Sequence, residues 1–101
     1  MTDVIVLGRA EAEVFGRYEW LHGESPERAG KFDDDMSEAI FMLAHHPEIA
    51  SRWRRSPLRC YRLHRWNFGL FYAIEGRRVV IVAAQDLRQD PESIQRRLGL
   101  T

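Results

Sequence analysis

The spacing of the apolar residues changes once along this chain, from a helical period in its first half to an alternating period in its second half. In the first half, apolar residues recur every three or four positions in two series: Ala10, Val14, Tyr18 and Leu21, then Ala29, Phe32, Met36, Ile40 and Leu43. Such spacing places the apolar side chains of each series on one face of a helix. The first half therefore predicts two amphipathic helices.

Capping residues indicate where these helices begin and end. Gly23 is expected to end the first helix by adopting the left-handed conformation after its last turn. Ser25 suits the N-cap and Pro26 the first position of a second helix, which is expected to stop near His45 and His46. Because so few residues separate the two helices, they should form an antiparallel hairpin.

The second half predicts a meander of strands. Alternating apolar residues mark strands over 58–64, 66–75 and 78–84, with a tight turn at Gly76 and Arg77, and residues 3–7 form a further short strand. Pro91 can open a last helix over 92–98, closed by Gly99. The order β-α-α-β-β-β-α predicts an α+β fold, in which the helical hairpin packs on a small, mainly antiparallel sheet. A chain of 101 residues fits one domain spanning 1–101.

Charge is distributed unevenly, although the net charge is zero. Residues 1–50 hold four basic and eleven acidic residues, whereas residues 51–101 hold eleven basic and four acidic ones. The second half can therefore meet an anionic partner, either nucleic acid or an acidic protein segment. The single cysteine, Cys60, excludes an internal disulfide. No signal peptide or membrane-length apolar run is visible, so a cytoplasmic protein is expected.

Residues 59–76 combine an arginine-bearing strand, an aromatic entry around Trp66, a strand containing Phe71 and Tyr72, and a polar turn. Residues 78–84 add an apolar strand, and residues 85–91 read Gln-Asp-Leu-Arg-Gln-Asp-Pro. In this order and spacing, the chain resembles the ParE/RelE toxin superfamily over nearly its whole length. The resemblance departs at Asn67, where the family often has Pro, and at Asp86, where it usually has His. Gln89 replaces the second Arg of the closing motif.

The resemblance implies the toxin of a type II toxin–antitoxin module, neutralised by a cognate antitoxin whose flexible segment folds over it. ParE-like members of the superfamily inhibit DNA gyrase, whereas RelE-like members cleave mRNA on the ribosome. A third possibility is a degenerate member that binds its antitoxin and is no longer toxic. The resemblance implies no cofactor and no metal.

A RelE-like nuclease needs cations for the phosphate and groups that move protons. The candidates are Arg59, Arg65 and Arg88 for phosphate, and His64 or Asp86 for protons. Arg62 has the opposite parity to Arg59 and Arg65, so a regular strand cannot present all three on one face. An unperturbed aspartate is ionised at neutral pH and is a weak acid catalyst. The ParE-like, non-enzymatic interpretation is therefore favoured. On that interpretation, the residues that bind antitoxin or target are Arg59, Arg62, Arg65, Trp66 and Arg88.

Overall fold

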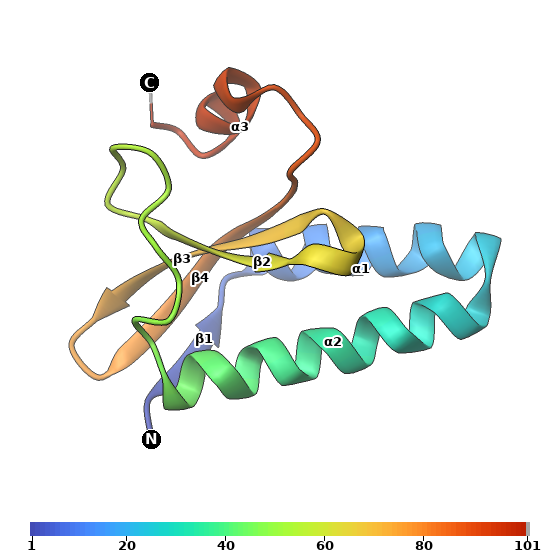
Figure 1. The fold of residues 1–101 in the computed structure, drawn as a ribbon, viewed down its shortest axis with the longest axis horizontal. Helices are drawn as coiled ribbons and strands as arrows, with labels where there is room; N and C mark the ends of the chain where they lie inside the picture. The colour runs from blue at the N-terminus through green and yellow to red at the C-terminus, as the bar shows by residue number, and fades with distance from the viewer. Residues whose placement is uncertain (101) are drawn as a thin grey trace.

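The predicted order of helices and strands is confirmed by a computed structural model, which describes residues 1–100 (Figure 1). The elements are β1 (Asp3–Val6), α1 (Gly8–Glu24), α2 (Pro26–His45), β2 (Arg59–Leu63), a short 3-10 helix (His64–Trp66), β3 (Phe68–Glu75), β4 (Arg78–Asp86) and α3 (Pro91–Arg97). None of the helices in residues 1–100 combines the length and apolar character needed to cross a lipid bilayer.

The four strands form one sheet in the order β1-β4-β3-β2. Strands β2, β3 and β4 are antiparallel neighbours, whereas β1 pairs in parallel with β4, with Val4 opposite Val79. The expectation of a mainly antiparallel sheet is therefore confirmed. Strands β1 and β2 are the two edges of the sheet, and β2 carries two of the candidate site residues, Arg59 and Arg62.

Each face of the sheet carries its own core. The helical hairpin covers one face, where its apolar residues pack with those of β3 and β4, among them Phe32, Leu43, Leu70, Tyr72 and Ile81. Helix α3 and the loop before β2 cover part of the other face, with a smaller core of Trp53, Leu58, Cys60, Phe71, Ala83 and Ile94. Alternation along β3 explains this division, because Phe71 and its neighbour Tyr72 enter opposite cores.

A single residue, Ser25, separates α1 from α2. Gly23 remains inside α1, which continues to Glu24, so the prediction of a left-handed Gly23 is wrong. Extended Ser25 serves both helices instead. Its N–H donates to the Leu21 carbonyl at 2.7 Å, and its Oγ accepts the N–H of Arg28 at 3.3 Å. The predicted N-cap at Ser25, followed by Pro26, is confirmed.

The predicted strand boundaries around residue 65 are wrong. Strand β2 ends at Leu63 and β3 begins at Phe68, because His64 to Trp66 form the 3-10 helix. Asn67 closes that turn in the left-handed conformation with φ 49°, which asparagine tolerates better than most residues. Strand β4 extends to Asp86, which pairs with Phe68. The turn at Gly76 (φ 61°) and the left-handed Gly99 (φ 73°) agree with the prediction.

Candidate functional site

Arg59 at the start of β2 is engaged in the fold. Its side chain is half-buried, and Nη1 donates to the Ala50 carbonyl at 2.7 Å. Directly across the β2–β3 pair, the hydroxyl of Tyr72 donates to the Pro47 carbonyl at 2.7 Å. The two side chains together fasten the segment that follows α2, so Arg59 has a structural task in this molecule.

Arg65 and Trp66 meet one carboxylate on α2. The buried Trp66 indole donates from Nε1 to Asp35 Oδ2 at 2.9 Å, and Arg65 Nε lies 3.8 Å from the same oxygen. The Trp66 ring also makes an edge contact with Phe32, and the Arg28 guanidinium lies 5.5 Å from its centroid. Trp66 is thus a core residue, whereas the Arg65 side chain remains 61% exposed.

Asp86 at the end of β4 is held between two arginines. Arg88 donates from its backbone N–H and from Nη2, both at 2.8 Å, and from Nε at 3.1 Å, while Arg17 of α1 donates from Nη2 at 2.8 Å. These hydrogen bonds, those from Arg88 foremost, hold the pKa of the Asp86 carboxyl well below its usual range. Asp86 is therefore a carboxylate at neutral pH.

Arg17 is itself part of a stack. Its guanidinium lies 5.7 Å from the Trp20 ring centroid and 5.1 Å from that of Phe68. These cation–π contacts help to hold the guanidinium beside the carboxylate of Asp86. Sequence reasoning missed Arg17, since its partner Asp86 lies 69 positions away and nothing in the periodicity of α1 marks it.

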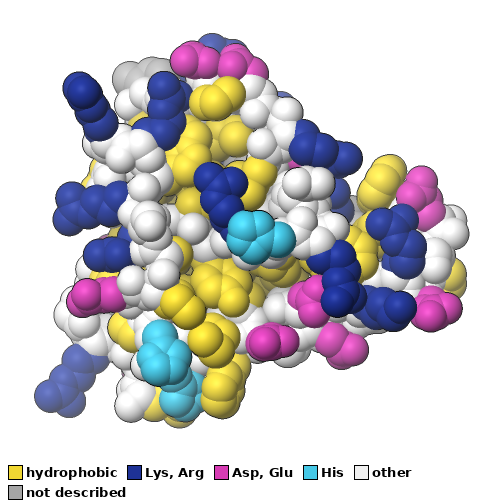
Figure 2. Space-filling view, in the orientation of Figure 1, with side chains coloured by type: hydrophobic (Ala, Val, Ile, Leu, Met, Phe, Trp, Pro, Cys, Tyr) yellow, Lys and Arg dark blue, Asp and Glu magenta, His cyan; other side chains and the backbone are white. Residues whose placement is uncertain are grey.

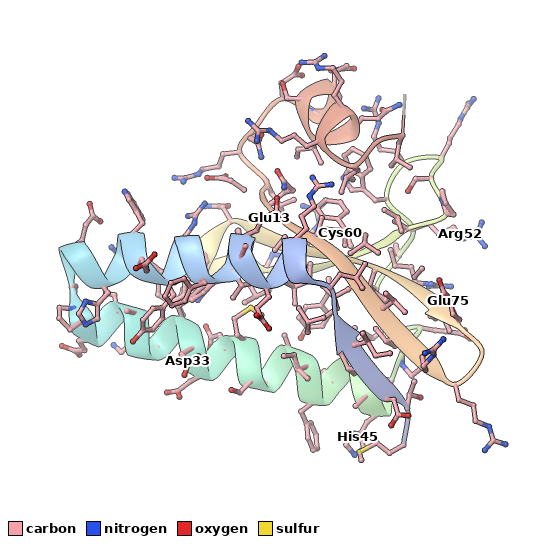
Figure 3. All side chains as sticks on the ribbon, turned by 180° about the vertical axis from the view of Figure 1, so that it is seen from behind. Glu13, Asp33, His45, Arg52, Cys60 and Glu75 are labelled. Atoms are coloured by element: carbon pink, nitrogen blue, oxygen red, sulfur yellow. The ribbon has the colours of Figure 1, made fainter. Side chains whose placement is uncertain are left out.

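Glu13 is a second residue that the sequence did not reveal. Beyond the end of β1, its carboxylate on α1 accepts the Ala84 N–H at 3.0 Å and the side-chain amide of Gln85, the buried polar residue of β4. Figure 3 shows Glu13 at the end of α1 nearest the strands. Glu13 therefore covers backbone of β4 that β1 is too short to reach.

Arg62 and His64 share a groove on the sheet face opposite the helical hairpin. The groove has a volume of about 720 Å³ and its walls include Arg52, Trp53, Cys60, Arg62, His64 and Pro91. Arg62 follows Cys60 by two positions in β2, so both side chains lie on the same face. Burial raises the pKa of the Cys60 thiol to about 11, which removes it as a nucleophile.

Charged side chains are distributed unevenly over the surface. In the view of Figure 2, Lys and Arg side chains gather over the left and upper part, whereas Asp and Glu side chains follow α2 at the lower right, with further Lys and Arg side chains among them. Between α1 and α2 lies a second groove, of about 440 Å³, lined mainly by apolar side chains that include Val14, Tyr18, Met36 and Ile40. Phe15 at its rim is 57% exposed.

The candidate residues do not converge on one point. Arg62 and His64 line the large groove, whereas Asp86 and Arg88 line a different depression beside α1. Arg59 and Arg88 donate hydrogen bonds to acceptors within the described chain, and Arg65 forms an ion pair with Asp35. Among the described residues, the candidates therefore fall into separate places on the surface, with Arg62 and His64 in one groove and Asp86 and Arg88 in another.

These features define a small α+β protein with a helical hairpin, a four-stranded sheet and a basic sheet edge, and the same fold occurs among solved toxin–antitoxin structures. A chain described as "Chromosomal ParDE TA system from P. aeruginosa" superposes with a TM-score of 0.72 at 20% sequence identity, covering 86% of this chain and 97% of that chain. Residues 4–91 match the family described as ParE toxin of type II toxin-antitoxin system, parDE. The chain belongs to this ParE toxin family. Among curated proteins, none matches it.

Proposed function

We propose that this chain is the toxin of a type II toxin–antitoxin pair, that a cognate antitoxin neutralises it in the cytoplasm, and that its target is DNA gyrase. Membership of the ParE family supports the toxin role. The choice of gyrase over mRNA rests on Asp86. The superfamily's usual histidine is replaced at this position by a carboxylate that Arg17 and Arg88 keep ionised. An ionised carboxylate cannot protonate a leaving oxygen.

A RelE-like ribosome-dependent endoribonuclease is the second candidate, and one observation favours it. The exposed His64 lies in the same groove as Arg62, so a phosphate and a titratable imidazole could meet there. Cleavage also needs a second group for the other proton transfer. The other proton-transfer candidate from the sequence, Asp86, lines the depression beside α1 and not the groove that contains His64. The gyrase proposal needs no such pair, because an inhibitor acts by binding.

The antitoxin fits the apolar groove of the helical hairpin. An amphipathic segment that folds on binding would place its apolar side chains against Val14, Tyr18, Met36 and Ile40. The charges of the surface would orient the bound antitoxin. The arginines of residues 51–101 attract acidic residues of the antitoxin, and the carboxylates of α2 attract basic ones.

Two assays with purified protein test the proposal. Gyrase supercoils relaxed plasmid in the presence of ATP, and we expect the chain to reduce supercoiling and the co-purified antitoxin to restore it. A translation reaction with ribosomes and a defined mRNA is the matched assay for the second candidate. Cleaved mRNA with normal supercoiling would overturn the gyrase proposal in favour of the RelE-like activity. Inactivity in both assays, with the antitoxin still bound, would identify a degenerate member.

A further inference from the structure

The loop between α2 and β2 carries three exposed arginines around one buried tryptophan. Arg52, Arg54 and Arg55 are exposed, and residues 52–55 are called the arginine turn below. Trp53 between them is buried and makes an edge contact with Phe71, with ring centroids 5.4 Å apart. Figure 3 places Arg52 on the outer side of this loop. The tryptophan therefore anchors the turn while the arginines remain at the surface.

Hydrogen bonds hold the arginine turn in one shape. The N–H of Trp53 donates to the Leu58 carbonyl at 2.8 Å, and the N–H of Ser56 donates to the Trp53 carbonyl at 3.1 Å. Arg54 adopts the left-handed conformation, with φ 54°, which costs free energy in a residue that has a Cβ. Its side chain donates to Gln95 of α3 at 3.1 Å. Backbone strain of this kind gathers at functional sites, and a turn already in shape loses little entropy on binding.

Several donors of the arginine turn have no acceptor in the described chain. Within residues 1–100, neither Arg52 nor Arg55 forms an ion pair with a carboxylate. The backbone N–H groups of Arg54 and Arg55 donate to no carbonyl of the described backbone. Two grooves, of about 720 and 630 Å³, flank the turn, and the described residues that line them include no Asp or Glu. These donors are therefore available to an anion.

The surroundings of the arginine turn favour one class of anion. No large apolar side chain of residues 51–58 is exposed, since Trp53 and Leu58 are both buried. Protein partners bind mainly through apolar and aromatic anchors, which the turn does not offer. Single-stranded nucleic acids stack their bases on exposed aromatic rings, and the Trp53 ring is covered. Guanidinium and backbone N–H groups are the donors that contact the phosphates of a double helix.

We propose that the arginine turn binds the phosphate backbone of double-stranded DNA without reading its sequence. Arg52 and Arg55 each contact a phosphate. Arg54 fastens the turn to α3 and adds a third cation beside them. This contact goes beyond binding to gyrase, because it gives the chain a hold on the DNA itself. The choice of DNA over double-stranded RNA rests on the proposed gyrase target, whereas the binding of phosphate does not.

The salt dependence of DNA binding tests the proposal directly. Binding of the purified chain to a short fluorescein-labelled duplex is followed by fluorescence anisotropy at several salt concentrations, without gyrase. Each neutralised phosphate contributes about −0.9 to the slope of the logarithm of the association constant against the logarithm of salt concentration. Three arginines therefore predict a slope of about −2.7, and duplexes of unrelated sequence should bind equally well.

Paired substitutions separate the arginine turn from net charge. Arg52→Ala combined with Arg55→Ala should bring the slope to about −1 and weaken binding at low salt about tenfold or more. Arg77→Ala combined with Arg78→Ala is the matched control. It removes the same charge from exposed positions at the β3–β4 turn and should leave the slope unchanged. Lysine at positions 52 and 55 keeps the charge and should keep most of the slope, which separates loss of charge from a disturbed turn.

The outcomes separate this contact from the proposed function. If the chain inhibits gyrase but binds no duplex, the DNA contact is overturned and the gyrase target stands. If it binds duplex through the turn but leaves supercoiling unchanged, the contact stands and the gyrase target fails. Equal losses from the two paired alanine variants would overturn the turn as the binding site. Tighter binding to duplex RNA would overturn the choice of DNA, and displacement of the duplex by polyglutamate at equal charge would show a site for acidic protein instead.

Discussion

Asp35 in the middle of α2 accepts a hydrogen bond of 2.9 Å from the indole nitrogen of Trp66, which follows β2 by three residues. This one contact joins the helical hairpin to the turn that redirects the chain from β2 into β3. It also places Arg65 on the solvent side of the turn, 3.8 Å from the same carboxylate. The position of Arg65 therefore depends on the hydrogen bond between the buried Trp66 and Asp35 of α2.

We expect Trp66→Phe to lower the free energy of unfolding by about 1–2 kcal/mol, because an aromatic ring is kept but the donor to Asp35 is lost. Urea denaturation followed by circular dichroism measures the change. Trp20→Phe is the matched control, since Trp20 is 55% exposed and its indole forms no described hydrogen bond. Equal effects of the two substitutions would show that the Trp66–Asp35 bond contributes nothing specific.

The pKa of Asp86 is lowered in the folded chain, first by hydrogen bonds from Arg88 and also by those from Arg17. A carboxyl with a lowered pKa stabilises the fold above its unfolded pKa of about 4, and this stabilisation is lost as the pH falls further. We therefore expect Asp86→Asn to be less stable than the unsubstituted chain at pH 7, by a margin that narrows below about pH 4. Urea titrations at several pH values measure the margin, and a margin unchanged down to about pH 3 would contradict the arrangement.

Gly69 in β3 has no room for a side chain. A Cβ there would lie 2.7 Å from the Cys60 sulfur and 2.8 Å from Leu87 Cδ2. We expect Gly69→Ala to destabilise the chain by about 1–3 kcal/mol. Gly30→Ala in α2 is the control, because a Cβ at that position would meet nothing within 4 Å, and it should be stabilising by about 0.5–1 kcal/mol. Thermal melts of both variants test the contrast.

Cys60 should react slowly with thiol reagents in the native chain. Its side chain is buried between Phe71 and Gly69, and burial raises its pKa to about 11, so the reactive thiolate is scarce at neutral pH. Labelling with Ellman's reagent should be complete within minutes in about 6 M guanidinium chloride, a concentration above the unfolding midpoint of ordinary domains. Without denaturant it should be far slower. Rapid native labelling would mean that the core around Trp53 opens readily.

Local patterns in the sequence sufficed for the order of the elements. The helical spacing of Ala29 to Leu43, the capping pair Ser25 and Pro26, and the alternation in residues 78–84 each reflect interactions between close neighbours. The errors arose where a local signal had a competitor. Gly23 is typical of a helix end, but α1 continues to Glu24 and the chain turns at Ser25. Trp66 is typical of a strand, but it lies in the 3-10 helix that the left-handed Asn67 closes before β3.

The candidate site was less accessible to sequence reasoning, because its contacts join distant positions. Arg17 with Asp86, Glu13 with Ala84 and Asp35 with Trp66 connect α1 or α2 to residues more than thirty positions away. The alternation of side chains along a strand correctly predicted that Arg59 and Arg62 lie on opposite faces of β2. Arg65 lies beyond the end of the strand, in the 3-10 helix. Some arginines donate hydrogen bonds within the fold, as Arg59 does to the Ala50 carbonyl. The sequence does not show which ones, because these contacts depend on tertiary structure.

Pulse-labelling in bacteria tests the central claim most directly. The chain is induced alone, and incorporation of labelled thymidine and labelled methionine is followed over time, with antitoxin co-expression as the control that should restore both. We expect thymidine incorporation to fall first, because gyrase inhibition stops replication before translation. Methionine incorporation falling first would contradict the gyrase proposal and direct attention to Arg62 and His64, and growth with neither affected would contradict the toxin role itself.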